Sequence, residues 1–248
     1  MDFHILFFVL VGFIAQLIDG ALGMAYGVSS NTFLLSIGVP PAAASASVHM
    51  AECVTTAVSG ASHWKLGNID KVLVKKLLIP GVLGGIAGAY ILTSIDGKAI
   101  KPYVSGYLIL MGLVILAKAL RKNHVHKEVH SHLVPLGLVG GFFDAVGGGG
   151  WGPIVTTTLV ARGSAPRFAI GSVNFSEFFV TFAQSVTFFL TLGVLDTWKI
   201  IIGLLVGGVI AAPIAAVAAR KLPTRILMAR VGILIILLSV RTIVLTLR

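Results

Sequence analysis

The chain has 248 residues, of which 56% are hydrophobic and only 11% are charged. So apolar a composition excludes a water-soluble globular domain and indicates an integral membrane protein, with the lipid bilayer as its surroundings. The formal net charge of +10 does not predict a nucleic-acid partner, because no basic helix with interleaved aromatic residues occurs. Stretches near twenty residues long that carry almost no charge predict transmembrane helices instead.

The first predicted element is a broken helix. Residues 4–18 are apolar, the stretch from Asp19 to Gly23 interrupts them, and residues 24–37 are apolar again. The second apolar piece would rise about 21 Å as a helix, less than the roughly 30 Å of a hydrocarbon core. We therefore expect a re-entrant hairpin over residues 4–38. The alternative is two short full crossings, which would place every loop on the same side of the membrane as the hairpin does.

The rest of the chain continues this pattern and then repeats it. After the first hairpin, apolar spans are predicted over residues 42–64, 72–95 and 102–120. A His-rich linker over residues 121–132 ends the N-terminal repeat, which we place at 1–120. The C-terminal repeat, 133–248, is predicted to hold a hairpin over 133–163 and spans over 168–190, 199–219 and 226–246.

The two halves share a register of 125 residues. DGALGMAYG, which begins at Asp19, recurs as DAVGGGGWG, which begins at Asp144, and Glu52 recurs as Glu177. Three spans per half is an odd number, so the second half starts on the opposite membrane face. The predicted fold is an all-α polytopic membrane protein with two inverted repeats, each a re-entrant hairpin plus about three transmembrane helices.

The basic residues predict the orientation. With this topology, 14 of the 19 Lys and Arg lie on the side of the linker. By the positive-inside rule that side is cytoplasmic, and both termini are external. We expect a multi-pass protein of the inner membrane.

The candidate substrate site lies at the two hairpin tips. Glycines there allow positive φ and a close approach of the backbone to a ligand. The half-helices after each tip present free N–H groups, which bind anions without any Lys or Arg. The alternative is that the glycines only permit tight helix packing. The candidate substrate-binding residues are Gly23, Met24, Tyr26, Asn31, Gly148, Gly149, Gly150, Trp151, Ser47, Ser172, His49 and Asn174.

Four acidic residues recur in symmetric pairs at predicted membrane depth, where charge is costly and points to function. Asp19 and Asp144 precede the half-helices and either cap them or couple to the ligand. Glu52 and Glu177 lie in mid-span, where removal from water favours the neutral form and suits reversible protonation. A neutral, hydrogen-bonded structural role remains open for both. Because ionised carboxylates repel an anion, proton-coupled anion movement is one consistent arrangement.

His49 lies three residues before Glu52, on the same helix face. The alternative function is therefore a divalent-cation or metal transporter that uses the intramembrane carboxylates and His49. We expect no resident metal centre, no cofactor and no ATPase subunit, since no nucleotide-binding loop is present. No nucleophile–base constellation occurs either, so the protein is not expected to be an enzyme and no catalytic residue is assigned.

Two blocks carry a family resemblance. Each hairpin tip reads D-(x)3-G-(x)3-G, and each is followed by a Pro-bounded span with S-V-x-x-x-E, at Ser47 to Glu52 and at Ser172 to Glu177. These blocks resemble the TauE/SafE family of sulfite exporters and probable membrane transporter proteins. The resemblance implies a secondary transporter for a small sulfur-containing oxyanion, sulfite or an organosulfonate.

Overall fold

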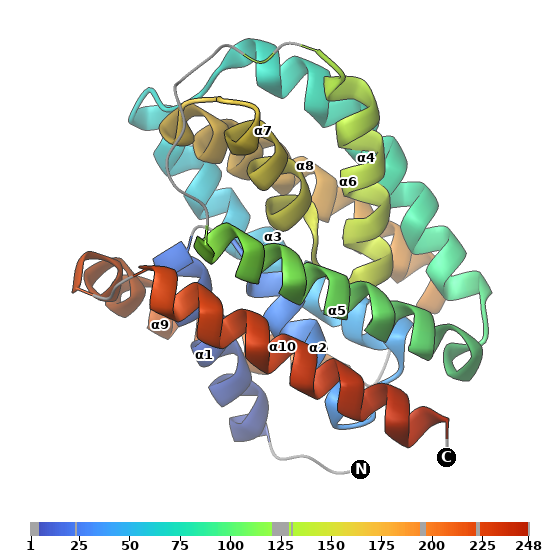
Figure 1. The fold of residues 1–248 in the computed structure, drawn as a ribbon. Coiled ribbons are helices and arrows are strands. Elements are labelled where there is room, and N and C mark those ends of the chain that lie inside the picture. Colours follow the sequence, from blue (N-terminus) through green and yellow to red (C-terminus); the bar gives the residue numbers. More distant parts are fainter. Residues whose placement is uncertain are drawn as a thin grey trace.

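The computed structural model describes residues 5–22, 24–120, 129, 131–193, 197–221 and 224–247. Within these ranges every regular element is a helix and no strand occurs, which confirms the all-α prediction (Figure 1). By length and composition, helices long and apolar enough to cross a membrane are found at Lys71–Ser94, Gly97–Leu120, Pro166–Leu192 and Met228–Thr246.

The helices follow the chain in two similar series. The first half forms α1 (Ile5–Leu22), α2 (Tyr26–Ser36), α3 (Pro41–Lys65), α4 (Lys71–Ser94) and α5 (Gly97–Leu120). The second half forms α6 (Leu133–Gly147), the π-helix η1 (Gly152–Thr156), α7 (Thr157–Ala161), α8 (Pro166–Leu192), α9 (Trp198–Lys221) and α10 (Thr224–Thr246).

Local residues explain where the long helices begin. Both α3 and α8 start on a proline, whose fixed φ and missing N–H suit the first helical position. α5 begins at Gly97 rather than at residue 102, because the carboxylate of Asp96 accepts hydrogen bonds from the N–H groups of Lys98 and Ala99 at 3.0 and 3.1 Å. Pro102 lies near this end and removes a single helical hydrogen bond.

The helices pack mainly in pairs: α1 against α9, α4 against α6, α5 against α10 and α3 against α8. Figure 1 shows α10 running alongside α5. Close approach depends on glycine. A Cβ at Gly84 would lie 2.1 Å from the carbonyl oxygen of Leu138, and one at Gly207 would lie 2.0 Å from that of Val9. These two glycines serve tight packing of α4 on α6 and of α9 on α1.

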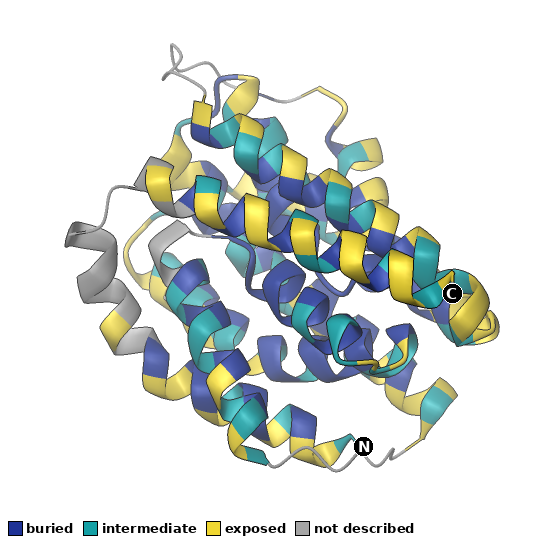
Figure 2. Cartoon of the chain, turned by 60° about the horizontal axis from the view of Figure 1, so that its bottom comes forward, coloured by how far each residue is buried: buried dark blue, intermediate teal, exposed yellow. Residues whose placement is uncertain are grey.

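The outer faces of the helices carry large apolar side chains. Leu83, Leu110, Phe182 and Leu237 are each more than half exposed. Figure 2 shows such exposed positions alternating with buried ones along the outer helices, around a buried interior. An apolar surface of this extent is suited to contact with lipid.

Candidate functional site

The helix breaks of the two halves touch each other, backbone to backbone. Gly148 and Gly149 follow α6 with φ of 64° and 145°, a conformation that side chains disfavour. A Cβ at Gly149 would lie 2.3 Å from the backbone nitrogen of Val28, and a Cβ at Gly27 would lie 2.7 Å from the Cα of Gly149. Any side chain at either glycine would force the two breaks apart.

Each break is held by the same type of bond. The Asp19 carboxylate accepts a hydrogen bond from the N–H of Tyr26, the first residue of α2, at 3.2 Å. The Asp144 carboxylate accepts one from the N–H of Trp151 at 2.8 Å. Both aspartates therefore satisfy one orphan donor at the start of a half-helix.

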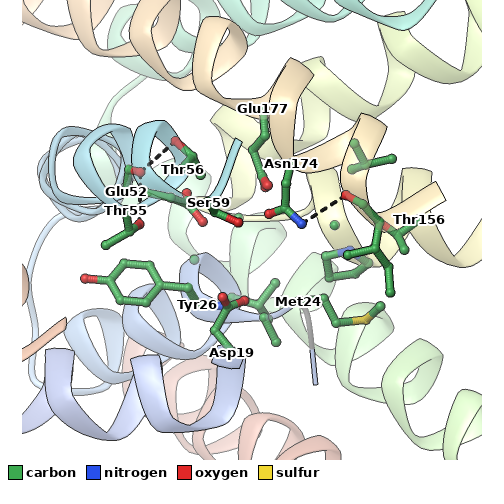
Figure 3. Close-up of a pocket in the computed structure, with 18 of the residues that line it drawn as sticks. Asp19, Met24, Tyr26, Glu52, Thr55, Thr56, Ser59, Thr156, Asn174 and Glu177 are labelled. Atoms are coloured by element: carbon green, nitrogen blue, oxygen red, sulfur yellow. Dashed lines mark hydrogen bonds between the residues drawn. The ribbon is translucent and has the colours of Figure 1, made fainter. Parts of the chain in front are cut away.

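A cavity of about 220 Å³ adjoins these breaks (Figure 3). Its walls come from α1, α2, α3, η1 and α8, together with the glycine turn after α6. The lining residues are Gln16, Asp19, Met24, Ala25, Tyr26, Gly27, Val28, Glu52, Thr55, Thr56, Ser59, His63, Gly149, Gly150, Gly152, Pro153, Thr156, Ile170, Val173, Asn174 and Glu177.

The cavity wall is acidic. Asp19, Glu52 and Glu177 approach the same space from α1, α3 and α8 (Figure 3). Neither Lys nor Arg is among the lining residues, and Nζ of Lys118 lies behind the wall, 3.4 Å from the sulfur of the lining residue Met24. Hydroxyl and amide groups provide the other polar side chains. An anion in this space meets neutral donors and carboxylates, and it is tolerated only if the carboxylates are neutralised.

The structure divides the predicted site residues into two groups. The residues that line the cavity are Met24, Tyr26, Gly149, Gly150 and Asn174, together with the acidic residues Asp19, Glu52 and Glu177. Those that lie away from it are Asn31, Gly148, Trp151, Ser47, Ser172 and His49, together with Asp144. Gly23 and most of the His-rich linker are outside the described residues.

Several residues away from the cavity stabilise its walls instead. The amide of Asn31 donates to the carbonyl of Gly147, which joins α2 to the glycine turn. Trp151 is fully buried, and its indole N–H donates to the carbonyl of Val173 at 3.1 Å. The hydroxyl of Ser172 accepts from the N–H of Asp70 at 2.8 Å, at the start of α4. These donors and acceptors therefore bond within the protein, whereas Oδ1 of Asn31 is buried without a hydrogen-bond partner.

His49 belongs to a buried polar cluster beside the cavity. Its Nε2 lies 3.2 Å from Oδ2 of Asp144, and its Nδ1 lies 2.7 Å from the carbonyl oxygen of Ser45. The amide of Gln184 donates to the same Asp144 oxygen at 3.0 Å. His49 and Gln184 have no solvent exposure and Asp144 has 1%, so this carboxylate is fully committed to protein partners.

Sequence reasoning missed much of the cavity wall. Thr55, Thr56, Ser59 and His63 line it, following Glu52 along α3. Their separations of three, four, seven and eleven residues from Glu52 place them on one helix face, and this polar stripe was the available signal. Gln16 was also missed. Its Oε1 is buried without a hydrogen-bond partner at the cavity wall.

Within the described ranges, no three His, Cys, Asp or Glu side chains gather closely enough to hold a metal ion. The carboxylates of the cavity come from separate helices and are accompanied by hydroxyl and amide groups. Among the described residues, the arrangement is a polar chamber lined by side chains from several helices.

The chain matches known proteins over most of its length. A protein-family model described as "Sulfite exporter TauE/SafE" matches residues 8–242. The chain is 46% identical over 246 residues to "Probable membrane transporter protein YtnM" of Bacillus subtilis (strain 168), an alignment that covers 96% of this chain and 82% of the relative. No solved structure matches. The resemblance predicted from the sequence is confirmed: this chain belongs to the TauE/SafE family of membrane transporters.

Proposed function

We propose that this protein is a secondary transporter that moves a small sulfur-containing oxyanion, sulfite or an organosulfonate, across the inner membrane by alternating access. The observation that carries most weight is the 220 Å³ cavity at the point where the two helix breaks meet. A ligand there would contact backbone from both halves at once, which is the usual position of a transporter's binding site.

Helix pairing supports two inverted repeats. A shift of 125 residues relates α1 to α6 and α4 to α9, so the α1–α9 pair corresponds to the α6–α4 pair. The same shift relates α5 to α10 and α3 to α8, and each of these helices packs against its own counterpart. The hydroxyls of Thr56 and Thr181, also separated by 125, lie 3.4 Å apart. Such a pattern is expected around a pseudo-two-fold axis between the halves.

Helix length supports re-entrant hairpins. α2 has 11 residues and rises about 16 Å, and α6 has 15 residues and rises about 22 Å. Both are short of the roughly 30 Å of a hydrocarbon core. Irregular backbone in mid-membrane is stable where it is buried or lines a cavity, and the glycine turn after α6 does both.

The acidic wall leads us to propose proton coupling. Glu52 and Glu177 repel an oxyanion when ionised, but each gains a hydroxyl donor when protonated. Entry of the anion would then require entry of protons, so the two would move together. Asp19 caps α2 through one carboxylate oxygen, Oδ1. Its second oxygen would be the one that takes up a proton.

The charge pattern gives the proposed orientation. The cavity follows α3 from Glu52 to His63, toward the end that carries Lys65. Arg167 lies beside this end, where its guanidinium donates to the side chain of Asn68. By the positive-inside rule this is the cytoplasmic side. We propose that the structure has its cavity open to the cytoplasm.

Flux into proteoliposomes tests the function. Sulfite and taurine are supplied separately under an imposed pH gradient, with protein-free liposomes as the control. We expect flux of one of them to follow the gradient, and Glu52→Gln with Glu177→Gln to remove that dependence. Flux of neither compound would overturn the substrate class, and an unaltered pH dependence in the double variant would overturn the coupling. The metal alternative is not favoured by the family.

A further inference from the structure

The cavity occupies one half of the α3–α8 pair, and the other half is closed. Cavity residues come from the C-terminal half of α3 and the N-terminal half of α8. In the opposite halves, Asp144 joins His49 and Gln184, and the ring of His49 lies 5.9 Å from the ring of Phe188. The hydroxyl of Ser45 donates to a backbone carbonyl of α6. We name these residues the closed cluster: Ser45, His49, Asp144, Gln184 and Phe188.

Each member of the closed cluster has a repeat counterpart on the cavity wall. The counterpart of each residue lies 125 positions away in the other repeat. In the order given above, the counterparts are Ile170, Asn174, Asp19, Ser59 and His63. All five counterparts line the cavity. The members of the closed cluster are at most 1% exposed, whereas every counterpart is partly exposed. The same five positions are therefore shut in one half of the molecule and open in the other.

We propose that the closed cluster is the gate on the external side of the transporter, and that its five counterparts form the cytoplasmic gate in the opposite conformation. In that state Asp19 would accept hydrogen bonds from Asn174 and Ser59, as Asp144 now accepts them from His49 and Gln184. This inference rests on the proposed alternating-access function and adds the residues that hold each side shut.

The bonding of the two aspartates makes such an exchange feasible. Oδ1 of Asp144 holds the N–H of Trp151, while Oδ2 takes the bonds from His49 and Gln184. Oδ1 of Asp19 likewise holds the N–H of Tyr26. One oxygen of each carboxylate can therefore keep its half-helix in place while the other makes or loses the gate bonds.

The two gates differ in strength. His49 and Gln184 are longer side chains than Asn174 and Ser59, and they reach the Asp144 carboxylate at 3.2 and 3.0 Å. The counterparts offer only neutral donors of shorter reach. The external gate should therefore close more firmly, which favours the cytoplasm-open state in the absence of ligand.

Thiol accessibility tests the gate. Cys53→Ser removes the single native thiol, and Ser45→Cys places a nearly isosteric reporter in the closed cluster. A membrane-impermeant maleimide is added from the external side. We expect slow labelling, and a rise of about tenfold when Gln184→Ala removes a hydrogen bond to the Asp144 carboxylate. The matched control is Ser185→Ala, whose hydroxyl has no hydrogen-bond partner. Equal labelling in the two alanine variants would overturn the gate.

A second pair of substitutions adds hydrogen-bond donors to the cavity wall and leaves the closed cluster unchanged. Asn174→His combined with Ser59→Gln gives the cavity wall the two donors that Asp144 now uses. We expect faster external labelling of the Ser45→Cys reporter and slower cytoplasmic labelling of a Thr55→Cys reporter. Unchanged rates at both reporters in a monodisperse protein would contradict the proposal. No substrate is added in these labelling experiments. Their outcome therefore tests the gate even if the flux experiment shows that sulfite is not transported.

Discussion

At the scale of single residues, Asp19 and Asp144 show how one motif takes two roles. Both carboxylates hold the first N–H of a half-helix. Asp144 has further bonds from His49 and Gln184 and 1% exposure, whereas Asp19 lines the cavity. Two aspartates at equivalent positions of the repeats thus have different surroundings. The difference decides which carboxylate can contact a ligand in the cavity.

We expect Asp144→Ala to destabilise the protein more than Asp19→Ala. Loss of one partner from a buried pair costs about 3–5 kcal/mol, whereas loss of a helix cap costs about 1 kcal/mol. The apparent melting temperature of the purified protein in detergent measures both. Equal melting temperatures for the two variants would show that the Asp144 network does not stabilise the fold.

Gly149→Ala should abolish correct folding and, with it, flux of the transported anion. A Cβ there would lie 2.3 Å from the nitrogen of Val28, at a φ of 145°, so the two breaks could not touch. The control is Gly106→Ala, since a Cβ at Gly106 meets nothing within 4 Å, and it should be neutral or slightly stabilising. Size-exclusion chromatography and flux distinguish the two. A folded, active Gly149→Ala protein would refute the close contact.

At the scale of elements, α3 combines two environments along one helix. Its N-terminal half contributes Ser45 and His49 to the closed cluster, and its C-terminal half contributes the polar stripe from Glu52 to His63. α8 runs beside it with the opposite division. In the proposed mechanism, opening and closing of the cavity therefore depend on this pair.

Filling the cavity from α3 should block flux without unfolding the protein. Ser59→Leu replaces a lining hydroxyl with a larger apolar group, whereas Val58→Leu introduces the same leucine at a neighbouring apolar side chain that is 66% exposed. We expect flux of whichever anion the wild-type protein transports to fall at least about tenfold in the first variant and to stay near wild type in the second. Proteoliposome flux at matched protein content is the measurement. Comparable flux in both would place the pathway elsewhere.

At the scale of the whole molecule, the proposed topology puts the C-terminus outside and the region between the halves inside. In the Cys53→Ser background, Leu247→Cys should react with an impermeant thiol reagent in intact cells, because residue 247 is 73% exposed at the external end. Ser131→Cys, also at an exposed position, should react only after permeabilisation. Reaction of both in intact cells would contradict the inverted arrangement.

Much of the architecture can be read from the chain because its causes are local. Apolar runs bounded by Pro41 and Pro166 mark where α3 and α8 begin, and the recurring D-(x)3-G-(x)3-G blocks mark where helices break. Helix lengths and helix-starting prolines act through neighbouring residues, so a sequence pattern contains them. The family follows from the same blocks.

Only the tertiary structure decided which side chains face the cavity. His49 and Asn174 are equivalent in sequence, yet the first is sealed against Asp144 and the second lines the open wall. A pseudo-symmetric sequence describes both arrangements equally well, because it does not specify which of two related conformations is occupied. That choice depends on contacts between α3, α6 and α8 that join residues far apart in the chain, such as the 95 residues from His49 to Asp144 and the 40 residues from Asp144 to Gln184.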